Sequence, residues 1–450
     1  MAADPGFADD TRRVPAATRA IGVSWPRVGE TGRVAAITLV TMGSWGDLFP
    51  FVGLGRALVA RGHEVRLAAS PAWEDVVVGA GVPFVGVGRR FGFEEFRRHP
   101  EIFRRVPFGL RHALGRLVFD QIDELTGDLR DAMAGADLVV THPAQVAAHN
   151  VAEHLGVRRV VATVFPGMIP SSTTVPGGTR VGPWPGWAGR AANRMAWRGA
   201  RVGTAVLFDR PINRHRRRLG LPRVRAALLE LPQQAEATIV MASPHVISPP
   251  LDWPGSVTVT SFVAWDGAAE RPLDDTTRAF LDAGTPPVLV TLGSNGAIQP
   301  DDFFDQAARL VLDQGLRALV VTGPGGRPGG VVGLDDVHVT EYVALSELMD
   351  RCRAAVHHAG VGTTVAAISA GTPQVVVPKG FDQPDTAARV EALGIGLSVP
   401  WDKRHRRLTP ALHRVLSEPR FSKRAAALGA CVRQEDGAAT SADAIESHLP

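Results

Sequence analysis

Runs of apolar residues alternate along the chain with amphipathic stretches, and glycine-rich turns separate them. Residues 34–40 read VAAITLV, the uninterrupted apolar run typical of a buried parallel strand. A loop, TMGSWGDLFP, comes next, followed by an amphipathic stretch, Phe51–Arg61, and a second strand, EVRLAA. This order of strand, glycine loop, helix and strand predicts one α/β unit of a parallel sheet.

The same unit returns 250 residues further on: the segment from Val40 reads VTMGSWG and the segment from Val290 reads VTLGSNG. A proline, a helix and a strand again follow the loop, at Pro300, Phe303–Gln314 and Leu316–Thr322. Two such halves predict an α/β protein of two facing Rossmann-like domains with a cleft between them. The alternative is that this loop is merely a favoured way to leave a strand.

The two copies differ at a position that matters for chemistry. The first loop carries Asp47, whereas the second carries Ala297 at the matching place. An acidic residue on only one of the two loops indicates that the first half carries out the chemical step and that the second half binds a ligand.

Between the copies the alternation continues, with strands expected at Asp137–Thr141 and Val160–Val164 and a basic helix over 191–218. Residues 165–190 are rich in Gly, Pro and Trp and show no period, which is typical of a functional loop. Its Trp184 and Trp187 would line an apolar pocket, make weak contact with a membrane surface, or simply pack within the loop.

The pattern predicts a division into a flexible extension, a first Rossmann-like domain, a linker, a second Rossmann-like domain and a C-terminal helix. The corresponding ranges are 1–33, 34–250, 251–286, 287–425 and 426–450.

Composition narrows the function classes. Of the 450 residues, 45% are apolar and 21% charged, which excludes disorder of the whole chain, and no apolar run approaches the ~20 residues of a bilayer span. Two cysteines give neither a disulfide framework nor a metal site, so we expect a reducing, cytoplasmic compartment. The net charge of +4 rests on arginine clusters without stacking aromatics, which argues against nucleic-acid binding.

The segment with the strongest candidates for ligand-binding residues is 357–389, HHAGVGTTVAAISAGTPQVVVPKGFDQPDTAAR. An apolar strand ends just before His358, and a helix is expected to open at Gly360–Thr364. Free N–H groups in the first turn, the helix dipole, the hydroxyls and the imidazole together favour an anion such as a diphosphate, without a metal. The alternative is an ordinary helix N-terminus beside a core histidine. Twenty-four residues on, Asp382-Gln383 pairs a carboxylate with a carboxamide that could hold sugar hydroxyls.

The run HHAGVGTT…AGTPQVVVPKGFDQPDTAARV resembles the donor-binding motif of family 1 glycosyltransferases of the GT-B fold. The similarity is greatest to actinobacterial enzymes that glycosylate antibiotics and to sterol glucosyltransferase-like proteins. It extends over nearly everything after residue 33, including GSWGDLFP and EYVALSELM.

The resemblance implies roles for individual residues. His358 would contact the α-phosphate, and Asp382 and Gln383 the sugar hydroxyls; Tyr342 would stack on the nucleobase, which the backbone of Val343 would bind. The remaining phosphate contacts would come from the second loop and the helix start, namely Ser294, Gly360, Gly362 and Thr363.

Asp47 falls on the position of the catalytic base in this family. An acceptor hydroxyl has a pKa far above 7 and needs a positioned base during attack. The alternative for Asp47 is a helix N-cap. His142, after the strand Asp137–Thr141, could orient Asp47 or the acceptor.

The sequence departs from plant-type relatives in two places. Ala366 stands where those enzymes carry a glutamate that grips the ribose of a UDP-sugar, which favours a TDP-sugar. Ala344 replaces the usual proline near the base-binding residue and leaves the base selectivity open.

We therefore expect an inverting, metal-independent enzyme that moves a sugar from a nucleotide-diphosphate donor to a hydrophobic natural product. The donor is a co-substrate, and no cofactor is expected. The acceptor would be contacted by Trp45, Phe91 and Trp184. The alternatives are a UDP-glucose-dependent sterol or lipid glucosyltransferase and a catalytically silent auxiliary homologue. The sequence does not fix the sugar, the acceptor or the oligomeric state.

Overall fold

The computed structural model describes residues 34–103, 107–179, 184–294, 302–324, 326 and 328–450. The predicted extension 1–33 therefore lies outside the described residues. The same is true of Ala297 and Pro300, on which part of the loop comparison depended.

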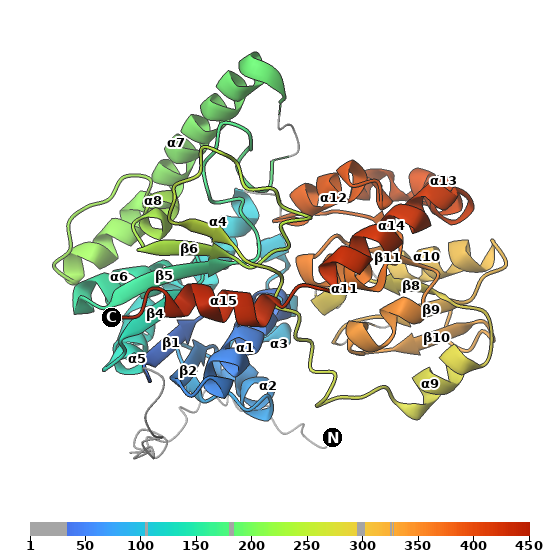
Figure 1. The fold of residues 1–450 in the computed structure, drawn as a ribbon, viewed down its shortest axis with the longest axis horizontal. Coiled ribbons are helices and arrows are strands. Elements are labelled where there is room, and N and C mark those ends of the chain that lie inside the picture. Colours follow the sequence, from blue (N-terminus) through green and yellow to red (C-terminus); the bar gives the residue numbers. More distant parts are fainter. Residues whose placement is uncertain (1–33, 104–106, 180–183, 295–301, 325, 327) are drawn as a thin grey trace, which may run out of the picture. The chain divides into compact units, whose positions relative to one another are not determined.

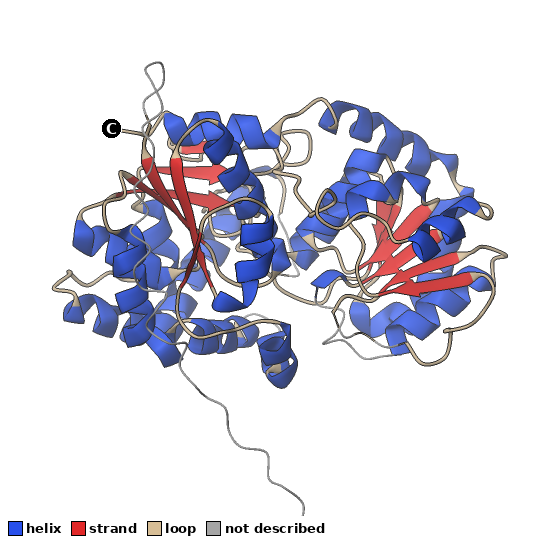
Figure 2. Ribbon diagram, turned by 90° about the horizontal axis from the view of Figure 1, so that it is seen from below, coloured by secondary structure: helices blue, strands red, loops and turns tan. Residues whose placement is uncertain are grey.

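The first sheet has seven parallel strands in the order β3-β2-β1-β4-β5-β6-β7 (Figure 1). Strands β1 and β4 are almost wholly buried, because helices cover the sheet on both faces (Figure 2). The strands are β1 Ala36–Val40, β2 Glu64–Ala69, β3 Phe84–Gly86, β4 Leu138–Thr141, β5 Arg158–Thr163, β6 Ala237–Val240 and β7 Val257–Val259.

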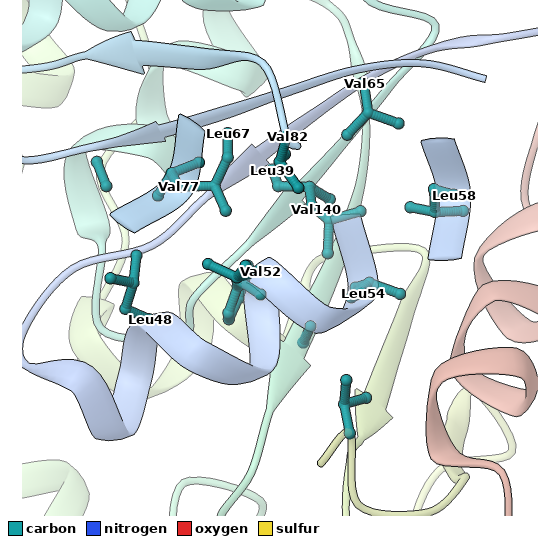
Figure 3. Packing of buried hydrophobic residues seen from close by; sticks show 14 of the residues in the cluster. Leu39, Leu48, Val52, Leu54, Leu58, Val65, Leu67, Val77, Val82 and Val140 are labelled. Carbon is teal, nitrogen blue, oxygen red and sulfur yellow. The ribbon is translucent and has the colours of Figure 1, made fainter. Parts of the chain in front are cut away.

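The α-helices that follow these strands are α1 Trp45–Ala60, α2 Glu74–Gly79, α3 Phe93–Arg98, α4 Phe108–Leu117, α5 Ile122–Met133, α6 Val146–Leu155, α7 Gly186–Arg218 and α8 Ala227–Gln233. Helix α1 packs its leucines and valines onto β1, β2 and β4, as Figure 3 shows for Leu48, Val52 and Leu54 against Leu39 and Val140. This core holds the loop after β1 in place.

Helix α1 begins six residues before the predicted stretch. The Asp47 carboxylate reaches back to accept a hydrogen bond from the backbone N–H of Ser44, with Oδ2 and N 3.3 Å apart. Such a bond satisfies an otherwise orphaned donor at the helix start, so the helix extends through the loop despite Pro50.

The second sheet has six parallel strands in the order β10-β9-β8-β11-β12-β13. Its strands are β8 Val288–Thr291, β9 Ala318–Val321, β10 Val337–Thr340, β11 Ala354–His357, β12 Gln374–Val376 and β13 Gly396–Ser398. The remaining α-helices are α9 Asp275–Asp282, α10 Asp302–Leu312, α11 Val361–Ala370, α12 Gln383–Ala392, α13 Arg404–Ser417, α14 Pro419–Val432 and α15 Gly437–Glu446. The chain thus forms two parallel-sheet Rossmann-like domains, as predicted.

The segment predicted as a linker, 251–286, contains two regular elements. Strand β7 pairs with β6 at the edge of the first sheet, and helix α9 packs beside β10 of the second. The Asp274 side chain caps α9 by accepting from the backbone N–H of Thr277 at 2.8 Å. The passage between the sheets is accordingly shorter than the sequence suggested.

The C-terminal segment 426–450 holds the end of α14 and the whole of α15. Helix α15 packs against α1 of the first domain, where Ala442 and Ile445 are fully buried in its core. Arg61 at the end of α1 donates to Asp443 and Glu446 at 2.7 and 2.8 Å. The last helix therefore belongs structurally to the first domain.

Candidate functional site

One cavity of about 1430 Å³ is lined by residues of both domains. From the first domain it includes the loop after β1 and the turn after β4, and from the second the loops after β8, β10, β11 and β12. Because parallel strands present their carboxyl ends at one edge, the topology brings these loops together. The predicted residues on the cavity wall are Trp45, Asp47, His142, Trp184, Ser294, Tyr342, Val343, His358, Gly360, Gly362, Thr363, Asp382 and Gln383.

Asp47 and His142 lie side by side in this cavity. Strands β1 and β4 are neighbours, and the Nε2 atom of His142 is 3.5 Å from Oδ1 of Asp47. The backbone N–H of Ala144 donates to Nδ1 of His142 at 3.2 Å. This bond makes Nδ1 the acceptor, so in the neutral ring the proton is on Nε2, facing the carboxylate.

The two predicted roles of Asp47 use different oxygens. Oδ2 accepts the bond from Ser44 at the helix start, so the residue supports α1 from its first turn and is not the N-cap. Oδ1 faces His142. A Cβ at Gly43 would come within 2.2 Å of Oδ2, and its φ is +96°, so glycine is required for this arrangement.

His358 is clamped between two glycine loops at the end of β11. A Cβ at Gly293 would lie 2.7 Å from its Cε1 atom, and one at Gly360 would lie 2.4 Å from its Nε2 atom. Burial, and secondly the neighbouring His357, lower the pKa of His358 to about 3, so the ring is neutral. Its Nδ1 atom is buried and has no hydrogen-bond partner among the described residues.

The first turn of α11 lies on the same cavity wall. Gly360 is the N-cap, and the backbone N–H groups that follow it include those of Gly362 and Thr363. The first N–H groups of a helix have no intrahelical acceptor, and the dipole is positive there, so an anion is stabilised at this place. The hydroxyl of Thr364, one residue deeper, is buried with no partner among the described residues.

Asp382 is held close to both of these features. The backbone N–H groups of Asp382 itself and of Val361, the first residue of α11, both act to lower the pKa of its carboxylate. Burial raises its pKa to about 7, and the charge of Asp47 is the second cause. The carboxylates of the two domains therefore influence one another directly.

Gln383 is more constrained than the sequence suggested. Its side-chain oxygen accepts hydrogen bonds from the backbone N–H groups of Lys379 and Gly380, at 2.8 and 3.2 Å. These bonds close the loop after β12. The side-chain oxygen is therefore engaged within the loop.

Tyr342 connects the second domain to the first. Its ring meets Trp45 edge-on, with centroids 4.9 Å apart, and the guanidinium of Arg271 lies 5.4 Å from its centroid. Its hydroxyl donates to the carbonyl of Asp266 in the passage between the sheets. Burial raises the pKa of this phenol, which stays protonated. Sequence reasoning missed Asp266 and Arg271, because nothing local marks a passage residue as a partner of Tyr342.

With this geometry in view, comparison with known proteins identifies the family. The profile described as "Glycosyltransferase family 28 N-terminal domain" matches residues 37–157. That described as "Erythromycin biosynthesis protein CIII-like, C-terminal domain" matches residues 320–442. O-mycaminosyltylonolide 6-deoxyallosyltransferase of Streptomyces fradiae is 33% identical over 91% of this chain and 96% of its own length. Glycosyltransferase GtfE of Amycolatopsis orientalis is 32% identical over the same shares.

The chain belongs to the antibiotic-type glycosyltransferases. Solved structures agree in fold. The glycosyltransferase of kitacinnamycin superposes with a TM-score of 0.70 at 21% identity, over 93% of this chain and 100% of the other. The Streptomyces sp. SF2575 glycosyltransferase SsfS6, complexed with thymidine diphosphate, gives 0.63 at 20% identity, over 92% and 99%. Both support the GT-B fold predicted from the sequence.

One predicted acceptor residue of this glycosyltransferase lies elsewhere. Phe91 is not among the described residues that line the cavity; it is buried in the core, where its ring meets that of Phe96 at 5.0 Å. The Phe-rich stretch therefore contributes packing at this position. Trp184 does line the cavity and is 40% exposed.

Helix α7 forms a large part of the cavity wall of the glycosyltransferase, which was not predicted from the sequence. One face of α7 contributes small and apolar side chains, namely Ala196, Gly199, Ala200, Gly203, Thr204 and Leu207. Their three- and four-residue spacing was the available signal, since it places them on one side of a helix. Among the described residues, no cluster of three His, Cys, Asp or Glu side chains could hold a metal ion. Nor is any helix in the described part long and apolar enough to cross a membrane.

Proposed function

We propose that the protein transfers a sugar from a TDP-sugar to a hydroxyl of a hydrophobic natural product, with inversion and without a metal. The observation that carries this proposal is the meeting of Asp47, His358 and Asp382 on one cavity wall. A base, an anion site and a sugar-binding carboxylate are the three groups that such a transfer requires.

Asp47 is proposed as the general base. As the acceptor oxygen attacks the anomeric carbon, its proton passes to Oδ1 of Asp47. The bond from the anomeric carbon to the diphosphate breaks with its electron pair remaining on the diphosphate. His142 is proposed to position the carboxylate, because its Nε2–H faces the same oxygen at 3.5 Å.

The leaving diphosphate would lie at the start of α11. Backbone N–H groups there, the helix dipole and a hydrogen bond from neutral His358 would stabilise the charge that grows on it. The unpartnered Nδ1 of His358 supports this role, because a buried polar atom without a partner is costly unless a ligand completes it.

The preference for TDP rests on Ala366, which lines the cavity. Without a carboxylate at this position, a deoxyribose loses no contact that a ribose would make. The named relative that transfers 6-deoxyallose and the neighbour complexed with thymidine diphosphate are consistent with such a donor. The small and apolar face of α7 supports a hydrophobic acceptor.

Asp47→Asn tests the mechanism, with calorimetric titration of TDP alongside transfer assays. We expect transfer to fall by a factor of about 10²–10⁴, the usual contribution of a general base, while TDP affinity stays within about twofold. An equal loss of both would remove Asp47 from the role of base.

Titration of the unmodified protein with TDP and UDP decides between donors. Tighter TDP binding supports the proposal. Tighter UDP binding would favour the sterol or lipid glucosyltransferase, and binding of neither would favour a silent homologue.

A further inference from the structure

Helix α7 presents an unusual apolar stripe to solvent. Met195, Val202 and Val206 are 59%, 65% and 77% exposed. Their spacing of seven and four residues places them on one side of the helix. Buried residues of the N-terminal half, such as Trp197, occupy another side, and in Figure 1 the first turns of α7 extend beyond the labelled elements of the first sheet.

Arginines flank this stripe. Arg190, Arg194 and Arg198 follow one another at four-residue intervals and are all exposed. The sequence contains no aspartate or glutamate from Gly186 to Phe208. The one acid that pairs with an arginine of this segment is Glu230 of α8 among the described residues, at 2.7 Å from Arg201. Trp187 in the first turn is 80% exposed.

The stripe also borders the cavity. Gly199 and Gly203 lie on the cavity wall, next in sequence to the exposed Arg198 and Val202. Two exposed aromatic residues lie at or next to other parts of the same wall. Trp184 lines the cavity, and Phe108, which is 62% exposed, follows the lining residue Pro107 in the sequence. One helix thus offers its apolar surface to solvent and its small residues to the acceptor space.

We propose that this face of α7 docks on an anionic lipid surface. The arginines would bind lipid phosphates, Trp187 would lie at the headgroup level, and the stripe would enter the boundary with the acyl chains. The cavity mouth would then open at the lipid boundary. A hydrophobic acceptor partitions into that region, so docking would raise its concentration beside Asp47.

The charge pattern of this face of α7 favours an anionic lipid surface over a protein partner. A row of arginines without interspersed acids complements a surface that is uniformly negative, whereas protein interfaces interleave both signs with fewer charges at their core. The stripe is narrow, and association would be weak and reversible.

The test is co-sedimentation of the full chain with vesicles of phosphatidylcholine alone or mixed with phosphatidylglycerol. We expect binding to the mixed vesicles, weakening as salt is raised, and little binding to the neutral ones. This readout needs no donor or acceptor, so it can fail while the proposed transfer stands.

Two double variants test whether this face of α7 makes the contact. Arg190→Glu with Arg194→Glu should lower the vesicle partition coefficient about 30-fold or more. The control, Arg406→Glu with Arg407→Glu on α13, makes the same change in net charge and should lower the partition coefficient less. Val202→Asp with Val206→Asp should lower it about tenfold or more, and Val78→Asp on α2, itself 55% exposed, should not.

Unchanged TDP affinity will show that each variant is folded. The proposal is overturned if the unmodified protein does not bind the mixed vesicles, or if the α7 variants bind them as the controls do. Absence of vesicle binding together with a stable protein complex formed through the same face would assign α7 to a protein partner instead.

Discussion

The indole ring of Trp45 meets the phenol ring of Tyr342 edge-on, with the two ring centroids 4.9 Å apart. One residue opens helix α1 of the first domain, and the other follows β10 of the second. The proposed acceptor contact, Trp45, and the proposed nucleobase platform, Tyr342, therefore belong to one aromatic cluster. Binding of the acceptor should change the affinity for the donor, and the reverse.

Removing this contact should alter donor binding from the acceptor side. An edge-on aromatic pair contributes about 0.5–1.5 kcal/mol, so Trp45→Ala should weaken TDP binding about two- to tenfold, and Trp45→Phe should retain most of the affinity. Calorimetric titration with TDP measures this. A change confined to the acceptor KM would show that the two rings are not coupled.

Stability should depend on pH through Asp382. Its pKa is raised to about 7 in the folded protein from 3.8, so the native state binds more protons than the unfolded state between these values. Stability contributed by this group should therefore fall as pH rises from about 4 to about 7 and stay level above.

Urea unfolding at a series of pH values measures this slope. Asp382→Asn should flatten it, and Asp47→Asn should do so partly, because the charge of Asp47 is the second cause of the shift. Asp131→Asn, at an exposed site on α5, is the matched control. A slope unaltered by Asp382→Asn would contradict the assignment.

The affinity for TDP should depend on the position of the His358 ring as well as on its hydrogen-bonding groups. Gly293→Ala leaves every polar group in place, yet its Cβ would fall 2.7 Å from Cε1 of His358. We expect TDP affinity to drop about tenfold or more, approaching that of His358→Ala. Gly315→Ala has a similar positive φ of +68° but open space around the new methyl group. Gly315→Ala should lower the stability of the protein without changing its affinity for TDP. If both variants lower TDP affinity equally, backbone strain is the cause.

The small side chains on the cavity face of α7 should limit the size of the acceptor that can bind. Ala200→Leu places a branched side chain on the cavity wall and should raise the acceptor KM about tenfold, while the KM of the donor stays the same. Ala191→Leu makes the same change at an exposed position of the same helix and should have no effect. Equal effects of the two would indicate a general disturbance of α7.

Much of the fold could be predicted, because buried parallel strands leave long apolar runs and the same loop opens both halves. The pattern placed β2 at EVRLAA and β11 just before the helix that carries the anion site. It failed at the start of α1, which depends on the Asp47–Ser44 bond. Such a bond leaves no periodic signal in the sequence.

The positions of Asp47 and His358 on the cavity wall were predictable, because each lies on a loop that follows the carboxyl end of a buried strand. The candidate site was not predictable where a contact joins segments distant in sequence. The oxygen of Gln383 is occupied by its own loop, and Phe91 is buried in the core although its neighbourhood is rich in aromatic residues. Burial decides such cases, and alternation alone does not reveal which aromatic residues face the cavity.

The return of α15 to the first domain gives the two sheets a pair of covalent connections. One is the passage after β7, and the other is the stretch between α14 and α15, which includes Glu435. The Glu435 carboxylate accepts hydrogen bonds from the hydroxyls of Ser243 and Ser261, at 2.8 and 2.6 Å. Two connections restrict the relative motion of the two sheets more than a single connection would. Opening and closing of the cavity would therefore follow a restricted path.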